Sequence, residues 1–207
     1  NKNFNPDDFK SSASKPYVIE LFYSLQFIDV NNIVIPLNCY SFPFPLQKRG
    51  LGFKGGINMA AILIEYNRFK SLGKKWYASA ELQCKIKLPF TQPYYNQRAL
   101  GTDNAYLRGL EYYVIDGVMH GLARFNLKKE MFNFSLPTFL PLKTFKRIPI
   151  RIFAKIFTDA GYVYSDEETI SKLNNRFLYT KGFGIDIVTF YDFHLKLEYA
   201  FNQLGQK

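Results

Sequence analysis

The sequence predicts an all-β protein, and within that class a transmembrane antiparallel β-barrel. Apolar and polar residues alternate in one segment after another, which is the period of a strand with one apolar face. Several segments alternate for much longer than the roughly 5–6 residues of an ordinary strand, and a strand that crosses a bilayer at a tilt needs about 9–11. Aromatic residues are abundant, with 21 Phe, 15 Tyr and one Trp. They gather near segment ends, where the interface girdles of a membrane barrel lie.

The clearest segment runs from Trp76 to Leu88. Its even positions are apolar: Trp76, Ala78, Ala80, Leu82, Cys84, Ile86 and Leu88. Its odd positions, from Tyr77 to Lys87, are polar or charged apart from the tyrosine. We expect the even face to contact lipid and the odd face to contact a watery lumen.

Four more segments alternate in the same way: 17–27, 147–164, 182–191 and 193–201. The segment 122–134 is less regular, and 56–69 fits either a strand or a short helix. Short breaks such as 71–75 read as turns, whereas 91–116 is a long loop rich in Gly, Asn, Gln and Tyr. We expect seven or eight strands, which fits an eight-stranded barrel or half of a larger one. A soluble β-sandwich with long strands is the alternative fold, but its faces would rarely alternate over so many residues.

Composition excludes several classes. With 47% hydrophobic and 21% charged residues, the chain is not disordered, and its longest uncharged run, 57–64, is too short for a spanning helix of about 20 residues. Cys39 and Cys84 do not make a disulfide scaffold or a zinc motif. There is no P-loop, no GxGxxG and no nucleophile beside His194. We therefore expect no enzyme activity, no cofactor and no metal.

The formal charge of +10 raises the question of nucleic acid, but the basic residues alternate with apolar ones and do not form one patch. We expect them to face the lumen or anionic headgroups, and we expect no nucleic-acid partner. The chain begins with Asn1, which suggests a processed chain or part of a longer protein.

Two motifs and a final segment carry a family resemblance. They are Leu107-Arg108-Gly109-Leu110 in the long loop, Phe157-Thr158-Asp159-Ala160-Gly161 in a later strand, and the alternating apolar residues Phe193, Leu195, Leu197, Tyr199 and Phe201. In this order they resemble the bacterial surface-antigen superfamily, to which BamA, TamA and the two-partner-secretion transporters belong. Its loop motif, [IVL]RG[FY], is matched at three of four positions, since Leu110 replaces the aromatic residue. Its F-x-D-x-G pattern is matched at every fixed position.

This resemblance implies that residues 1–207 are part of a barrel domain, the C-terminal half of a sixteen-stranded barrel, with an inward-folding loop at about 91–117. It implies an outer-membrane protein of a Gram-negative bacterium that assembles, inserts or translocates proteins through lateral opening of the barrel seam, without a cofactor. Its partners would be outer-membrane lipids, unfolded outer-membrane proteins and periplasmic or lipoprotein accessory subunits. The alternative function is a small porin-like or adhesin-type barrel in which the LRG tripeptide is accidental.

The resemblance also assigns roles to residues. Arg108 would fold inward and meet the lumen acid Asp159 through charge-assisted hydrogen bonds. The family's second acid, in a pattern like E-x-R, corresponds to Asn126 here, with Lys128 at the basic position. Glu130 on the same face could replace that acid, or Asp159 could act alone.

The residues alone, without the resemblance, allow other partners for Arg108 and Asp159. Asp116 and Glu111 within the loop are alternative acids for Arg108. Without the resemblance, Arg108 would be a solvated loop charge, and Asp159 would pair with Lys155 on its own face.

The final segment, Phe193 to Phe201, resembles the family's closing strand and would form the seam. Gly182 and Gly184 lie in the neighbouring strand, where missing side chains permit bending. Family barrels usually end in an aromatic residue slightly further on, so we expect a short final stretch beyond Lys207.

Overall fold

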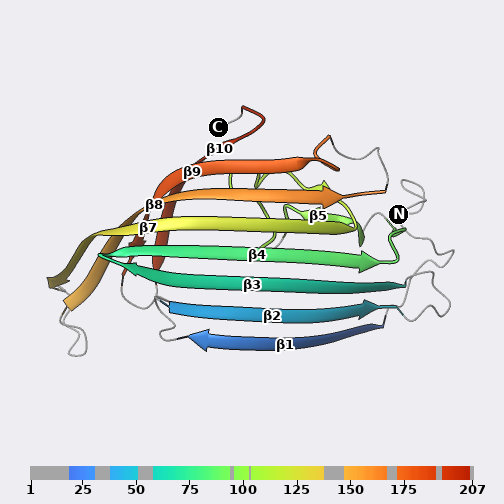
Figure 1. Ribbon diagram of the computed structural model, residues 1–207, viewed down its shortest axis with the longest axis horizontal. Helices are drawn as coiled ribbons and strands as arrows, with labels where there is room; N and C mark the ends of the chain where they lie inside the picture. The colour runs from blue at the N-terminus through green and yellow to red at the C-terminus, as the bar shows by residue number, and fades with distance from the viewer. Residues whose placement is uncertain are drawn as a thin grey trace.

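The computed structural model describes residues 19–30, 38–50, 58–93, 96–102, 104–137, 147–166, 172–189 and 193–205, and the regular structure there is β. The strands are β1 (Glu20–Val30), β2 (Asn38–Arg49), β3 (Met59–Gly73), β4 (Trp76–Leu88), β5 (Arg98–Leu100), β6 (Ile115–Asp116), β7 (Met119–Pro137), β8 (Arg147–Tyr164), β9 (Phe177–Val188) and β10 (His194–Asn202). Eight of them form one antiparallel sheet in the order β1-β2-β3-β4-β7-β8-β9-β10 (Figure 1). Among the described residues, no helix has the length and apolar character needed to cross a membrane.

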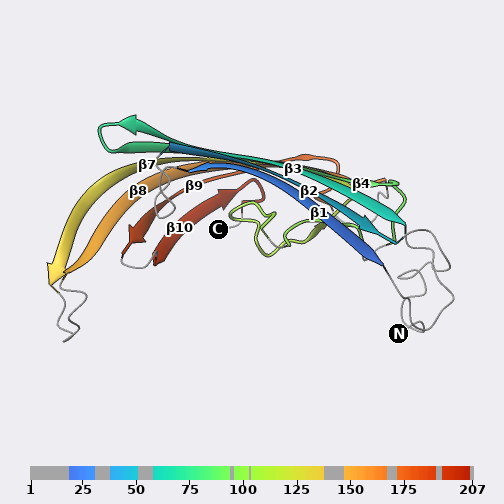
Figure 2. The same ribbon diagram turned by 90° about the horizontal axis from the view of Figure 1, so that it is seen from below.

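The large sheet is arched, with one concave and one convex face (Figure 2). The connection from β4 to β7 lies on the concave side and contains the small two-stranded sheet β5–β6. Strands β1 and β10 are the two edges, and each pairs with one neighbour within the described part of the chain. The sheet is therefore open.

The alternation predicted from the sequence separates the two faces. Residues that are paired across antiparallel strands point to the same side, and the register aligns Ser79, Asn126 and Phe157 in one row of the concave face. The even positions of β4 lie on the convex face, together with most of the exposed apolar residues of the other long strands. Large apolar side chains exposed there include Leu25, Phe27, Ile64, Leu82, Phe125, Ile156, Phe183, Ile185, Leu197 and Tyr199.

The less regular segment has a local cause. The pairing of β7 with β8 shifts register between Glu130 and Phe132. An extra residue in one strand reverses the parity beyond it, so that Phe125 before the shift and Phe134 after it both face the convex side. The segment 56–69, which fitted either a strand or a short helix, is part of strand β3. Its first residues, 56 and 57, lie outside the described residues, and so does Tyr17 at the start of segment 17–27.

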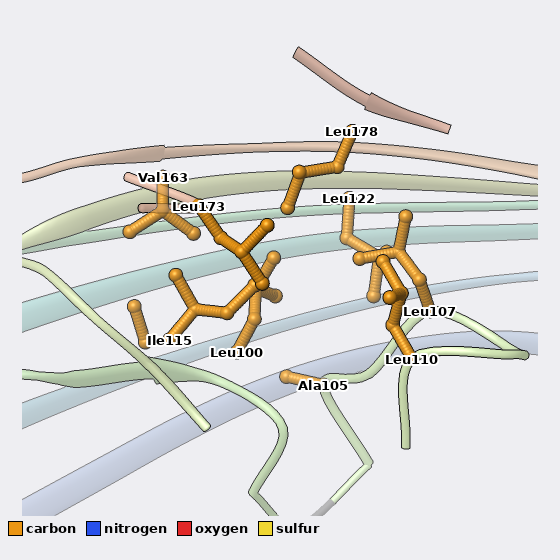
Figure 3. Packing of buried hydrophobic residues seen from close by; sticks show 10 residues of the cluster. Leu100, Ala105, Leu107, Leu110, Ile115, Leu122, Val163, Leu173 and Leu178 are labelled. Atoms are coloured by element: carbon orange, nitrogen blue, oxygen red, sulfur yellow. The ribbon is translucent and has the colours of Figure 1, made fainter. Parts of the chain in front are cut away.

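The core lies between the long loop and one end of the sheet (Figure 3). Leu100, Leu107, Leu110 and Ile115 come from the loop, and the sheet and the β8–β9 connection contribute the residues beneath them: Leu122, Val163, Leu173 and Leu178. Each of these side chains is at least 94% buried, since the most exposed, Leu173, retains 6% of its surface. Burying one side chain of this size contributes about 1.5–3 kcal/mol. The loop is thus a packed second layer on the concave face.

Gly182 on β9 leaves room for atoms of the two neighbouring strands, β8 and β10, which makes a testable prediction. A Cβ at this position would lie 2.4 Å from Phe157 Cζ and 2.3 Å from the Tyr199 carbonyl oxygen. We expect Gly182→Ala to lower the free energy of unfolding by about 1–3 kcal/mol through overpacking, measured from the urea midpoint. Gly121→Ala is the matched control, because a Cβ there has nothing within 4 Å, and it should leave stability equal or higher. Equal effects of the two changes would contradict this account.

Candidate functional site: a loop held on the concave face

The loop motif forms a tight turn. The Leu110 amide donates a hydrogen bond of 3.0 Å to the Leu107 carbonyl, and Gly109, the third residue of the turn, has a φ of 87°. A positive φ at this place is what a type II turn requires, and glycine adopts it without strain. The turn places Arg108 at its tip.

Arg108 points into the sheet and contacts Asp159. Its backbone N–H donates to Asp159 Oδ2 at 3.0 Å and its Nε donates to the same oxygen at 2.8 Å. Its Nη2 donates to Oδ1, which completes a bidentate pair. The Asp159 side chain has no exposed surface and that of Arg108 has 9%. The contact expected between these two residues is therefore present.

The rest of the guanidinium is also occupied. Nη1 donates to Asn126 Oδ1 at 2.5 Å and lies 3.7 Å from a carboxylate oxygen of Glu198. Its Cζ lies 3.9 Å from the centre of the Phe157 ring, the distance of a cation–π contact. Burial alone would lower the pKa of Arg108, but the hydrogen bonds and charge of Asp159, followed by the charge of Glu198, raise it. The guanidinium therefore keeps its charge although it is out of water.

All three fixed positions of the strand motif contact the loop. The Phe157 ring lies against the guanidinium and Asp159 accepts its hydrogen bonds. Gly161 makes room for the neighbouring leucine, because a Cβ on it would lie 2.9 Å from Leu107 Cδ1. The two motifs therefore fit together residue by residue.

Gly109 joins the turn to the edge strand β10. A Cβ on Gly109 would lie 2.9 Å from the Cβ of Ala200, so only glycine fits this approach. Asn202 Nδ2 donates to the Gly109 carbonyl at 2.8 Å. The turn thus touches β8 on one side and β10 on the other.

Two further basic side chains hold the loop from below. Arg124 on β7 donates to the Tyr106 carbonyl at 2.6 Å and to the Asn104 carbonyl at 2.6 Å. Lys87 on β4 donates to the carbonyl oxygens of Asn96 and Arg98 at 2.6 and 2.5 Å. These side chains supply donors to loop carbonyls, of which that of Asn96 forms a buried hydrogen bond. Sequence reasoning missed them, because a loop carbonyl carries no signal in the sequence.

Several expected alternatives for the site are wrong. Glu130 does not reach Arg108, because it lies four residues beyond Asn126 on β7, about 13 Å along a strand. It accepts instead from Arg151 Nε at 2.9 Å. Asp159 is also not the only acid beside Arg108, because a carboxylate oxygen of Glu198 lies 3.7 Å from Nη1.

The remaining alternatives fail for similar reasons. The described ion pairs of Arg108 are with Asp159 and Glu198 only, so neither Glu111 nor Asp116 is its acid. Lys155 pairs with Asp186 at 2.5 Å and with Glu198, and not with Asp159.

A chain of alternating charges leads away from the pair across the concave face. From Glu198 it passes to Lys155, then to Asp186, and then to Lys128, whose Nζ lies 2.6 Å from Asp186. Glu198 and Asp186 were missed as site residues. Their parity places them on the polar face, but only the register of β9 and β10 shows which cation each one meets.

A cavity of about 720 Å³ lies beside this network on the concave face. Glu65 and Glu81 line one side, and Lys128, Lys155 and Lys196 line the other. Within the described residues, no three His, Cys, Asp or Glu side chains are grouped to hold a metal ion.

No protein-family model and no curated protein matches this sequence.

The Arg108–Asp159 pair makes a second prediction. Removing one partner of a buried pair leaves the other charge uncompensated, which costs about 3–5 kcal/mol. We expect Arg108→Ala to lower the free energy of loop opening by this amount while the sheet stays folded. Hydrogen exchange and proteolysis within 91–117 should then be faster. Arg108→Lys should fail partly, because an ammonium cannot reproduce the bidentate fork.

Glu130→Gln is the matched control for this loop prediction. It also removes one member of a buried ion pair on the concave face, but that pair does not touch the loop. Its loop amides should exchange as in the unchanged protein. Loop opening in both variants, or in neither, would show that Arg108 does not hold the loop.

Proposed function

We propose that this chain is the C-terminal half of a sixteen-stranded outer-membrane β-barrel, and that the intact protein inserts or translocates other proteins through lateral opening of its seam. The observation that carries this proposal is the fit of the Leu107-Arg108-Gly109 turn onto Phe157, Asp159 and Gly161. Both motifs of the surface-antigen superfamily thereby acquire a physical reason for their spacing.

The convex face supports the membrane part of the proposal. Its exposed apolar residues extend from β1 to β10, including Phe27, Leu82, Ile156 and Leu197. A soluble monomer rarely exposes a contiguous apolar patch beyond about 300–600 Å², whereas a bilayer requires such a band on a barrel. The shortest strand of the large sheet, β10, has 9 residues, which meets the length of about 9–11 for crossing a bilayer.

The contents of the concave face support the half-barrel part. An eight-stranded barrel has an interior just wide enough for its own side chains. Here the concave face carries a packed loop and, beside it, a cavity of about 720 Å³. Eight more strands, continuing from the open edges, would enclose this volume.

Strand direction refines where the seam lies. β10 runs in the same direction as β8 and β4, toward the end of the sheet at which the loop begins. Bacterial barrels have an even number of strands, short periplasmic turns and long outer loops. If the loop is an outer loop and the chain ends in the periplasm, one further strand follows β10. The seam then lies one strand beyond Phe193–Phe201, and β10 is the strand that supports it.

The mechanism of the proposed function needs no cofactor. A seam strand that pairs weakly with the first strand exposes backbone N–H and C=O groups to a client, which adds as a new strand. Gly182 and Gly184 on β9 pair with Ala200 and Glu198 on β10. Because these glycines have no side chains, the backbone of β10 lies close to β9: a Cβ on Gly184 would be 2.4 Å from the Leu197 carbonyl oxygen.

Membrane orientation makes a third prediction. If the convex face contacts lipid, Leu82→Arg should cost about 2–4 kcal/mol near the bilayer midplane, measured as the free energy of unfolding in vesicles. Gln83→Arg, its neighbour on the concave face, should have little effect. In a variant without Cys39 and Cys84, single cysteines at Glu81 and Gln83 should react with a membrane-impermeant reagent, whereas those at Ala80 and Leu82 should not. Equal labelling at both parities would reject the membrane barrel.

Seam opening makes a fourth prediction. In the intact protein, a disulfide between the first and the last strand of the barrel should stop client insertion and leave the barrel folded. Reducing the bond should restore the activity of the same molecules, which is the control for damage by the cysteines. A locked protein that remains fully active would remove the seam mechanism and favour a porin-like or adhesin-type barrel.

A further inference from the structure

The convex face contains a hollow that the proposed function does not use. Its floor is Ala78 and Ala80 on β4, and its volume is about 410 Å³. The register sets Lys70 beside Ala78 and Arg68 beside Ala80. Larger apolar residues form the opposite wall: Phe125, Leu127 and Ile156. Two alanines side by side between longer side chains thus make a short channel along β4.

One wall of the hollow is basic. Lys70 is exposed, and the Arg68 guanidinium lies 5.8 Å from the centre of the Tyr40 ring. The described residues include no ion-pair partner for Arg68 or Lys70. Nearby, Lys129 Nζ lies 5.2 Å from the ring of Trp76. Of the described strand residues on the convex face, the register leaves one acid, Asp29, which is opposite Tyr40.

We propose that this hollow binds an anionic phospholipid. One acyl chain would lie over Ala78 and Ala80 against Phe125 and Leu127, with the phosphate at Arg68 and Lys70. Arginine binds phosphate oxygens bidentately and lysine adds a mobile point charge. Basic side chains beside an apolar surface at headgroup level are the arrangement that recognises anionic lipids. The inference rests on the proposed membrane barrel, because it requires the convex face to lie in a bilayer.

The position of the hollow fits a headgroup site. It lies near the turn between β3 and β4, at Lys74 and Lys75, and on the other face of the sheet from the Arg108 turn, whose contacts Asn126 and Phe157 also line the hollow. The basic residues Arg68, Lys70 and Lys129 occupy neighbouring rows there, and Trp76 is beside them. Tryptophan and lysine at one level are typical of the membrane–water interface. A phosphate in the hollow would meet Arg68 and Lys70, and the described lining of the hollow contains no acid.

Trp76 supplies the reporter for the experiment, because it is the single Trp of the 207 residues. The intact protein, with any tryptophan outside these residues replaced by phenylalanine, is reconstituted into phosphatidylcholine vesicles. Brominated phosphatidylglycerol or brominated phosphatidylcholine is then added at equal mole fraction, and quenching of Trp76 gives the relative occupancy. A basic residue near an anionic membrane surface strengthens binding about fivefold, so each cation should raise the preference for the anionic lipid by about that factor.

Three variants separate the contributions. Arg68→Gln with Lys70→Gln should abolish the preference for phosphatidylglycerol while quenching by phosphatidylcholine remains. Lys48→Gln with Lys196→Gln removes the same charge away from the hollow and should keep the preference. Ala78→Leu fills the floor and should reduce quenching by the anionic lipid although the cations stay.

The outcomes distinguish the two proposals. Equal quenching of the unchanged protein by both brominated lipids would overturn the lipid site and leave the barrel intact. Loss of the preference in the Lys48 and Lys196 control as well would attribute it to net charge and also overturn the site. Absence of quenching by either lipid would show that the convex face is not in the bilayer, which overturns the membrane barrel itself.

Discussion

The position of the loop depends on one guanidinium that is held out of water. Asp159 is fully buried, and an isolated carboxylate at such a place would be strongly unfavourable. Arg108 compensates it with three hydrogen bonds and is itself compensated by Asn126, Glu198 and the Phe157 ring. A buried pair is favourable only when its geometry is good and its remaining groups are satisfied. The apolar contacts of Leu107 and Leu110 are made in the same turn, so the loop core and the ion pair form together or not at all.

The same register that builds this site also separates the two faces of the sheet. Alternate residues of β7, β8, β9 and β10 point to the concave side, and this parity brings the charged side chains Lys128, Lys155, Asp186 and Glu198 into one network. The intervening residues leave an apolar convex side with few charges. If the pairing register of a strand slipped by one residue, its apolar and polar side chains would exchange faces, and neither face would keep its character. The charge network and the proposed lipid-facing surface are therefore two consequences of a single pairing pattern.

The sequence could predict these faces because a strand has a fixed period of two, and the long segments carry it with few exceptions. It could predict Arg108 and Asp159 because both stand in motifs with a known resemblance. It could not predict Glu198, since parity gives the face of a residue and not its neighbour on another strand. The irregular alternation of 122–134 came from the register shift at Glu130, which depends on β8 as much as on β7. The departure at Asn126 was misjudged for another reason: an amide oxygen accepts from a guanidinium as a carboxylate does, without adding charge.

The turn couples the loop to the edge of the sheet. Gly109 accepts from Asn202 and lies against Ala200, and Glu198 on the same strand is close to the Arg108 guanidinium. A movement of β10 away from β9 would therefore stretch contacts to both Gly109 and Arg108, whereas the bonds from Arg108 to Asp159 on β8 would stay. In the proposed mechanism, opening at the neighbouring seam must work against these contacts or leave β10 in place. The second course keeps these contacts: β10 stays held to the loop on its concave face, and in the proposed mechanism the element that moves is a strand that would pair with its free edge.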